Sequence, residues 1–235
     1  MASNTPAFRN EILSGLPRDE LDRLCPDLHP VTFVLHQILH EVGAPIDDVY
    51  FPESGLMSLT ADTRDSGFVE VGVIGREGFA GTSVPLNAKA TAVHRALIQI
   101  PGIGYRMRAS VFQDALAVMP SLRDRCLRNI QFVMVQTSQS AACNARHEMP
   151  QRLARWLLMC LDRNDAPTLP MTQEFLSYML GVRRAGVSGV VNALQSTGAI
   201  RLSRGHLTVL DRALLEEETC SCYQFIKEAR IKILG

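Results

Sequence analysis

Residues 171–210, MTQEFLSYML GVRRAGVSGV VNALQSTGAI RLSRGHLTVL, contain two helical patterns followed by a pattern of paired strands. Thr172 is a helix N-cap residue, and apolar residues recur at helical spacing after it until Gly181 predicts a tight turn. A second helix is expected over residues 183–196, and residues 199–210 have the pattern of a β-hairpin with a glycine in its turn. Helix, short turn, helix and hairpin together predict a winged helix-turn-helix.

The side chains on the non-core side of the second helix are of the types that read double-stranded DNA. An α-helix fits the major groove, where Arg reads guanine and Asn reads adenine through forked hydrogen bonds. Basic residues of the hairpin are expected to contact backbone phosphates, which position a protein without reading sequence. The alternative is a module that contacts only other proteins. The candidate DNA-binding residues are Thr172, Gln173, Arg183, Arg184, Ser188, Asn192, Arg201 and Arg204.

The N-terminal part of the chain is acidic and the C-terminal part is basic. With 24 basic and 24 acidic residues, the formal net charge is zero. Residues 1–120 carry 9 basic and 14 acidic side chains, whereas residues 150–212 carry 8 and 4, and all eight of those basic residues are arginine. This asymmetry favours two domains with different partners, and arginine favours forked contacts to phosphate or guanine. An ordinary solvated surface is the alternative interpretation.

Upstream, residues 121–147 contain neither Gly nor Pro and predict a helix of roughly 40 Å at 1.5 Å per residue. Pro150 then begins the next helix. A long helix with a narrow apolar seam commonly pairs with a second copy of itself, so a homodimer through residues 121–147 is expected. The alternative is a helix packed on its own domain. The predicted seam consists of Leu122, Cys126, Ile130, Val133, Thr137, Ser140 and Ala145.

The N-terminal half of the chain has the sequence pattern of a β-domain. Between residues 31 and 107, short apolar runs alternate with Gly, Pro, Asp and Asn, which is typical of a β-sandwich, jelly roll or barrel. The expected strands include Val31–Leu35, Val49–Phe51, Leu56–Thr60, Phe68–Ile74 and Ala96–Ile100.

Several classes of protein are disfavoured by what the sequence does not contain. It has no apolar run of about 20 residues and no secretory leader pattern, so a cytoplasmic protein without membrane contact is expected. Hydrolase and Walker loops are absent, and no enzyme activity is predicted. A metal-dependent, cupin-like jelly-roll enzyme is the alternative, but His36 and His40 lack the His-x-His pattern, and no catalytic or metal-binding residue is assigned. The thinly spread cysteines predict reduced thiols, with no role assigned to Cys220 and Cys222.

Residues 151–158 (QRLARWLL) and 169–176 (LPMTQEFL), continued by MLGVRR at 179–184, resemble the DNA-binding domain of the Crp/Fnr family of bacterial transcription regulators. The resemblance follows nearly the whole chain in order. It implies an α+β protein with an N-terminal β-roll (jelly-roll) sensor domain at 1–120, a dimerisation helix at 121–149 and a C-terminal winged helix-turn-helix at 150–235. It also implies a sequence-specific homodimeric regulator of palindromic DNA sites, switched by an effector in the β-roll. RNA polymerase is a second candidate partner.

The family's cyclic-nucleotide pocket corresponds to the loop at residues 75–83, and this chain departs from it. Thr82 stands where the family has its ribose-binding glutamate, and no arginine occupies 92–94, where the phosphate-binding arginine belongs. Strand alternation also places Arg95 on the face opposite His94. We therefore expect no cofactor, do not expect cyclic AMP to bind, and leave the effector unidentified. The candidate effector residues are Arg76, Glu77, Gly78, Gly81, Thr82, Ser83, His94 and Arg95.

Two further family features differ. The iron–sulfur variant of the family uses several N-terminal cysteines, whereas Cys25 alone lies in that region here. In the recognition helix, Ala185 and Gly189 replace the family's usual Glu and second Arg. The usual DNA half-site therefore cannot be transferred to this chain.

Overall fold

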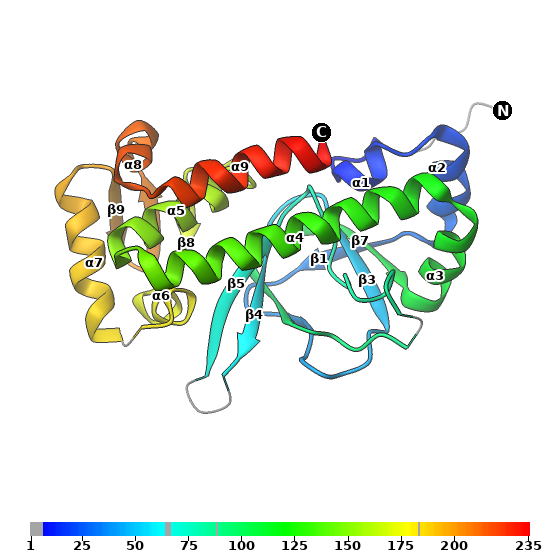
Figure 1. Cartoon of the computed structure of the whole chain (residues 1–235), viewed down its shortest axis with the longest axis horizontal. Coiled ribbons are helices and arrows are strands. Elements are labelled where there is room, and N and C mark those ends of the chain that lie inside the picture. Colours follow the sequence, from blue (N-terminus) through cyan, green and yellow to red (C-terminus); the bar gives the residue numbers. More distant parts are fainter. Residues whose placement is uncertain (1–6, 64–66, 88, 183) are drawn as a thin grey trace.

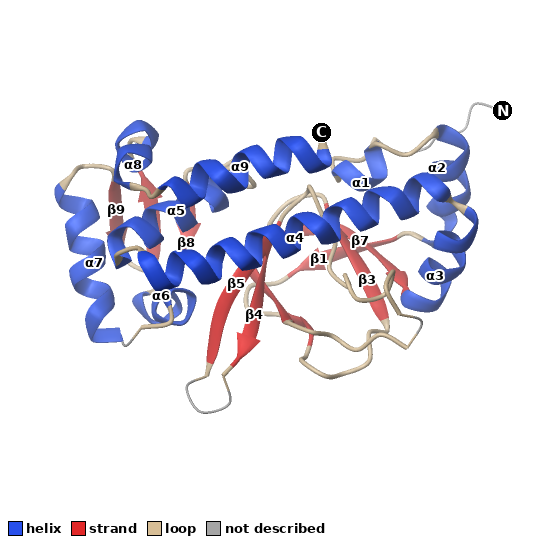
Figure 2. Cartoon of the chain, in the orientation of Figure 1, coloured by secondary structure: helices blue, strands red, loops and turns tan. Residues whose placement is uncertain are grey.

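The helix α4 (Pro120–Arg146) is the axis along which the other elements are arranged (Figure 1). The computed structural model describes residues 7–63, 67–87, 89–182 and 184–235. Strands lie on one side of α4, and helices gather at its two ends and along its edge (Figure 2). The helices are α1 (Glu11–Ser14), α2 (Arg18–Leu24), α3 (Ala109–Val118), α4, α5 (Met149–Leu161), α6 (Gln173–Leu180), α7 (Arg184–Ser196), α8 (Arg212–Glu218) and α9 (Ser221–Leu234).

Two antiparallel sheets form the N-terminal part and confirm the predicted β-domain. One sheet has the order β1-β7-β3 and the other β2-β6-β4-β5. A cluster of apolar side chains, among them Phe33, Met57 and Ile98, is buried within this part of the chain. The strands are β1 (His29–Phe33), β2 (Ile38–His40), β3 (Asp48–Pro52), β4 (Leu56–Asp62), β5 (Phe68–Ile74), β6 (Arg95–Ile100) and β7 (Gly102–Arg108).

A third sheet, β8-β10-β9, forms the wing of the C-terminal part. β9 (Ile200–Ser203) and β10 (His206–Val209) are the predicted hairpin. β8 (Thr168–Pro170), which is not among the strands expected from the sequence, pairs with β10. Three residues that include a proline carry too little strand pattern to be recognised, so this pairing depends on the partner strand.

Most of the predicted seam of α4 faces its own chain, so the predicted dimer seam is wrong at these positions, whereas Thr137 is half-buried and Ala145 is exposed. Leu122, Cys126, Ile130, Val133 and Ser140 are buried within the single chain. The reason is that the β-domain and α9 both pack on α4 and use these positions. α9 runs antiparallel to α4, with its start at the C-terminal end of α4 and its end near the N-terminal end of α4 (Figure 1).

The helix-turn-helix is packed against the β-domain. Leu56 and Val73 from β4 and β5 belong to the same buried apolar cluster as Trp156 of α5 and Leu176 of α6. The sheet β2-β6-β4-β5 therefore has one part of its surface covered by the C-terminal helices. No helix of the described residues is long and apolar enough to cross a membrane.

Candidate nucleic-acid interface

The first helix of the helix-turn-helix, α6, has the ends that the sequence predicts. The Thr172 side chain accepts a hydrogen bond from the backbone N–H of Phe175 at 3.1 Å. Gly181 ends the helix with a φ of +64°, a conformation that glycine adopts at little cost. Together these residues fix the length of α6 and the sharp turn into α7.

The second helix, α7, has one buried and one solvent-facing side. Val187, Val190 and Leu194 are buried in the common core, whereas Asn192 is exposed and Ser188 is half-buried. The Gln195 amide donates to the Asn192 side-chain oxygen at 3.3 Å, which leaves the Asn192 amide N–H groups available to a base edge. Of the two predicted arginines, Arg183 and the side chain of Arg184 lie outside the described residues.

A hydrogen bond connects the two helices at the candidate interface. The Ser188 hydroxyl donates to the Gln173 side-chain oxygen across 3.4 Å, from α7 to the first turn of α6. Thr172 beside it is exposed and Gln173 is half-buried. Three candidate residues are thus brought together where α6 begins and α7 crosses it.

The wing presents two exposed arginines. Arg201 on β9 and Arg204 in the turn are both exposed, and no ion pair of either is found in the part of the chain that the structure describes. Arg204 and Gly205 have φ values of +49° and +78°, which form the tight hairpin turn. Gln195 of α7 accepts a hydrogen bond from the Leu202 N–H at 2.7 Å and so attaches the wing to α7. The arginine charges are therefore held on the hairpin and exposed to solvent.

Comparison with known proteins agrees with this geometry. Residues 151–218 match the Crp-like helix-turn-helix domain. A Crp/Fnr transcriptional regulator from Eubacterium rectale superposes with a TM-score of 0.68 at 14% identity, covering 88% of this chain and 96% of that one. Residues 151–218 are thus similar to a Crp-like helix-turn-helix domain, and the chain as a whole has the fold of that Crp/Fnr regulator.

Two other solved structures give similar values. FixK2 from Bradyrhizobium japonicum superposes with a TM-score of 0.68 at 14% identity, covering 82% of this chain and 98% of that one. The c-di-GMP-responsive regulator CLP from Xanthomonas campestris gives 0.67 at 15% identity, covering 83% and 100%. At such identities the likeness concerns the fold. Among curated proteins, none matches this chain in sequence.

The loop predicted to bind an effector is engaged in internal contacts. The Glu77 carboxylate accepts a hydrogen bond from Arg163 Nε at 2.6 Å, and both side chains are almost fully buried. Burial alone would raise the pKa of Glu77, but the charges of Arg163 and Arg230 outweigh it and lower that pKa. Arg76 forms an ion pair with the exposed Asp165 at 3.2 Å. Glu77 thus stays ionised and paired inside the protein.

The glycines of that loop allow it to lie closely against its neighbours. A Cβ on Gly78 would stand 2.8 Å from the Asn129 amide of α4, which donates a hydrogen bond to the Glu77 carbonyl oxygen. Gly81 has a φ of +104°, and a Cβ there would approach the Val49 side chain to 2.8 Å. The loop is thereby connected directly to the long helix α4.

The remaining candidate effector residues are spread around the loop. Thr82 and Ser83 are half-buried. His94 is half-buried, and burial lowers its pKa. Arg95 forms an ion pair with Glu41 at 2.8 Å, and its guanidinium lies 3.5 Å from the centre of the Phe68 ring. Arg95 therefore contacts residues outside the loop and lines a cavity of about 610 Å³ between the sheet and α6.

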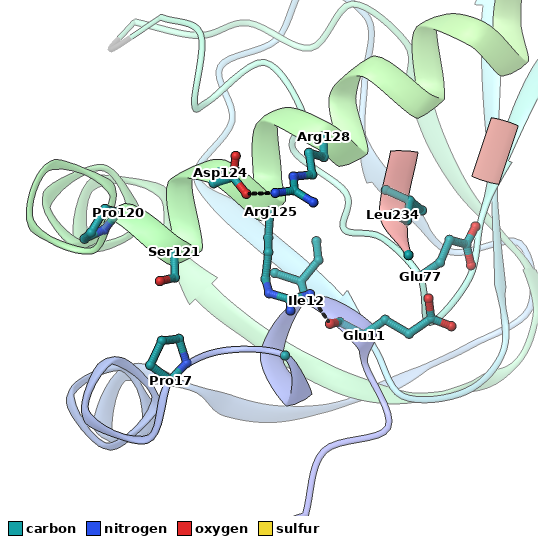
Figure 3. A pocket seen from close by; sticks show the side chains of 12 residues that line it. Glu11, Ile12, Pro17, Glu77, Pro120, Ser121, Asp124, Arg125, Arg128 and Leu234 are labelled. Carbon is teal, nitrogen blue, oxygen red and sulfur yellow. Dashed lines mark hydrogen bonds and ion pairs between the residues drawn. The ribbon is translucent and has the colours of Figure 1, made fainter. Parts of the chain in front are cut away.

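A second cavity, of about 450 Å³, lies where α1, the start of α4 and the end of α9 meet (Figure 3). Arg128 is ion-paired with Asp124 at 2.8 Å, and Arg125 points toward Glu11, to whose carbonyl oxygen it donates (Figure 3). Of the predicted effector residues, only Glu77 lines this cavity.

The alternative histidine cluster of a cupin-like enzyme does not form among the described residues, because His36 and His40 belong to no group of potential metal ligands there.

Sequence reasoning missed the polar residues that join the two parts of the chain. Glu70 of β5 accepts hydrogen bonds from the Ser58 hydroxyl at 2.6 Å and from Trp156 Nε1 at 2.5 Å. Burial raises the pKa of Glu70 to about 7 despite these hydrogen bonds. Glu70 lies within an alternating strand pattern, where a charged residue normally marks the solvent face, so the sequence contained no signal for its burial.

Proposed function

We propose that this chain is a sequence-specific DNA-binding transcription regulator that acts as a homodimer in the cytoplasm. The observation that carries this proposal is the position of Arg201 and Arg204, which have no ion pair among the described residues, beside the exposed polar side of α7 within a Crp-like helix-turn-helix. α7 is the element that enters the major groove, and the wing arginines bind the flanking phosphates. Bases are distinguished by Asn192 together with Arg184.

The dimer forms through the side of α4 that the chain itself leaves uncovered. Leu127 and Met134 are 38% and 64% exposed, and Ser138, Ala141 and Ala145 continue the same heptad-like stripe. Apolar and small residues at this spacing suit a helix–helix contact between two copies. The two recognition helices of the dimer then face half-sites about 34 Å apart, one turn of DNA.

An effector acts by changing how the helix-turn-helix packs on the β-domain. The loop at residues 75–81 contacts α4 through Asn129 and the C-terminal part through Arg163, so a ligand near this loop is sensed by both. Such a ligand shifts DNA affinity only to the extent that it prefers one packing over the other. RNA polymerase is the further partner that we propose for the DNA-bound dimer.

The test is selection of random duplex DNA by the purified full-length protein, with and without cell extract. We expect a two-fold symmetric motif whose half-sites are one helical turn apart. Affinity for the selected duplex should decrease steeply with rising salt concentration, because a protein that contacts several phosphates displaces counterions from the DNA. Absence of enrichment in both conditions, together with salt-independent binding, would assign the C-terminal part to protein contact instead.

A further inference from the structure

Four potential metal ligands meet where α4 ends and α9 begins. Cys143 lies in the last turn of α4 and His147 directly follows that helix, while Cys220 and Cys222 flank the first residue of α9. Their ligand atoms all lie within 4.8 Å of one another. Residues 143–147 and 220–222 are far apart in the sequence, so the folding of α9 onto α4 creates this cluster.

Two of the separations within the cluster match those of a tetrahedral metal site. Cys143 Sγ lies 3.5 Å from Cys220 Sγ, and Cys222 Sγ lies 3.5 Å from His147 Nδ1. With Zn–S bonds of about 2.3 Å and Zn–N bonds of about 2.0–2.1 Å, tetrahedral ligand atoms are about 3.5–3.8 Å apart. A disulfide would use only two of the sulfurs and would leave the third sulfur and the imidazole unexplained.

The surroundings of the cluster suit bound thiolates. The three cysteines are 0%, 5% and 2% exposed and form a small buried group separate from the apolar cores. Gln139, one turn before Cys143, donates its amide N–H to Cys222 Sγ at 3.0 Å. Hydrogen bonds of this kind commonly orient the ligands of a metal.

A buried positive charge lies beside the cluster. Arg155 of α5 is 6% exposed and donates to the Ser140 hydroxyl at 3.2 Å, three residues before Cys143. Its Nε has no hydrogen-bond partner among the described residues, and no carboxylate there forms an ion pair with it. Three thiolates, one imidazole and one divalent ion have a net charge of −1, which this guanidinium would balance.

We propose that Cys143, His147, Cys220 and Cys222 bind one Zn²⁺ in a tetrahedral Cys₃His site. Four protein ligands leave no open position for a substrate, so the site is structural. It holds the start of α9 against the end of α4, immediately before the turn into α5 and the helix-turn-helix. This proposal replaces the expectation, from the sequence, that the chain binds no metal.

The test measures metal content and coordination in the full-length protein. We expect about one Zn²⁺ per chain after purification in reducing buffer without chelator. Exchange for Co²⁺ should give the intense visible bands of tetrahedral thiolate-bound cobalt. Both signals should be lost in the Cys143→Ser/Cys220→Ser variant and kept in Cys25→Ser, a matched cysteine outside the cluster.

A conservative variant separates loss of the ligand set from loss of the fold. His147→Cys keeps four ligands, so it should retain Zn²⁺ and show stronger sulfur-to-cobalt charge-transfer absorption than the wild type. The proposal is overturned if wild-type protein remains metal-free after incubation with Zn²⁺ under reducing conditions. It is also overturned if the cobalt bands persist in Cys143→Ser/Cys220→Ser, or if the metal-free protein is lighter by the two hydrogens of a Cys143–Cys220 disulfide.

Discussion

Arg163 and Glu77 form a buried ion pair, with Arg163 Nε 2.6 Å from Glu77 Oε1 and side-chain exposures of 3% and 2%. Arg163 follows Asp162, the C-cap residue of α5, and Glu77 lies in the loop after β5, so the pair connects the helix-turn-helix to the β-domain. Arg163 also donates to the Met159 carbonyl oxygen at 2.9 Å, which fixes its orientation. Glu77, a candidate effector residue in the sequence, thus joins the β-domain to the C-terminal part of the chain through this ion pair.

Replacement of Arg163 by Met should strongly destabilise the protein, because it leaves the Glu77 carboxylate buried without its partner. We expect a decrease of about 3–5 kcal/mol in the free energy of unfolding at neutral pH, measured by urea denaturation. The double variant Arg163→Met/Glu77→Gln should lose less, since no unpaired charge remains. The matched control is Arg76→Met, which removes an exposed ion pair and should cost less than about 1 kcal/mol. Equal losses in the two single variants would contradict the assigned role.

Glu70 should make the stability of the protein decrease as the pH rises through the mildly acidic range. Its pKa is about 7 in the folded protein and 4.5 ordinarily, because burial disfavours the carboxylate. Between these values the unfolded chain is ionised while the folded chain holds its proton. The free energy of unfolding therefore falls with increasing pH, by at most about 1.4 kcal/mol per pH unit.

The measurement for Glu70 is urea denaturation at several pH values between 4.5 and 7. Glu70→Gln keeps one acceptor oxygen, which Trp156 can use, and its amide N–H can donate to the Ser58 hydroxyl oxygen. It cannot ionise, so its stability should vary less with pH than that of the wild type. The exposed Glu217 of α8 provides the control variant, Glu217→Gln, which should retain the wild-type slope. A wild-type slope in Glu70→Gln would show that other groups cause the dependence.

Met134→Glu should dissociate the proposed dimer. Met134 is 64% exposed at the centre of the uncovered stripe of α4, and two glutamates would face each other across the two-fold axis. Sedimentation velocity should show a monomer for this variant and a dimer for the wild type. Val34→Glu, at a residue that is 62% exposed after β1, is the matched control and should remain dimeric. A dimeric Met134→Glu protein would place the interface elsewhere.

Asn192→Ala should relax base preference at one position of each half-site. Its exposed amide can make a forked pair with adenine, and loss of such a pair costs about 1–3 kcal/mol of discrimination. The comparison is binding to the selected duplex and to duplexes with single base changes. An equal loss of affinity for every sequence would indicate that Asn192 contacts only the DNA backbone.

Arg204→Gln should reduce the salt dependence of DNA binding with little change in the preferred sequence. One fewer phosphate contact per chain lowers the slope of log K against log salt by about 0.9 for each half-site. Binding is measured by fluorescence anisotropy over a salt series. Lys232→Gln removes an exposed charge near the end of α9, far from the wing, and should leave the slope unchanged. An unchanged slope in Arg204→Gln would remove the wing from the interface.

The elements that were predicted correctly have strong local signals. α6 has a capping threonine and a terminating glycine, and residues 68–74 were expected to be a strand and form β5 with those bounds. The exposed position of Asn192 on α7 has such a signal too, because helical spacing separates it from the buried Val187 and Leu194, whereas its part in DNA binding stays a prediction. β8 has no such signal, since its three residues become a strand only beside β10.

The order of secondary-structure elements, the helix-turn-helix and its polar side follow from residues close together in the sequence, because capping, periodicity and turn formation act over a few residues. The side of α4 that remains free, the burial of Glu70 and Glu77, and the meeting of Cys143 with Cys220 depend on which surfaces pack together. α9 and α5 cover surfaces that the local pattern leaves open to solvent. Burial and long-range contact are properties of the packed chain, and only the tertiary structure specifies them.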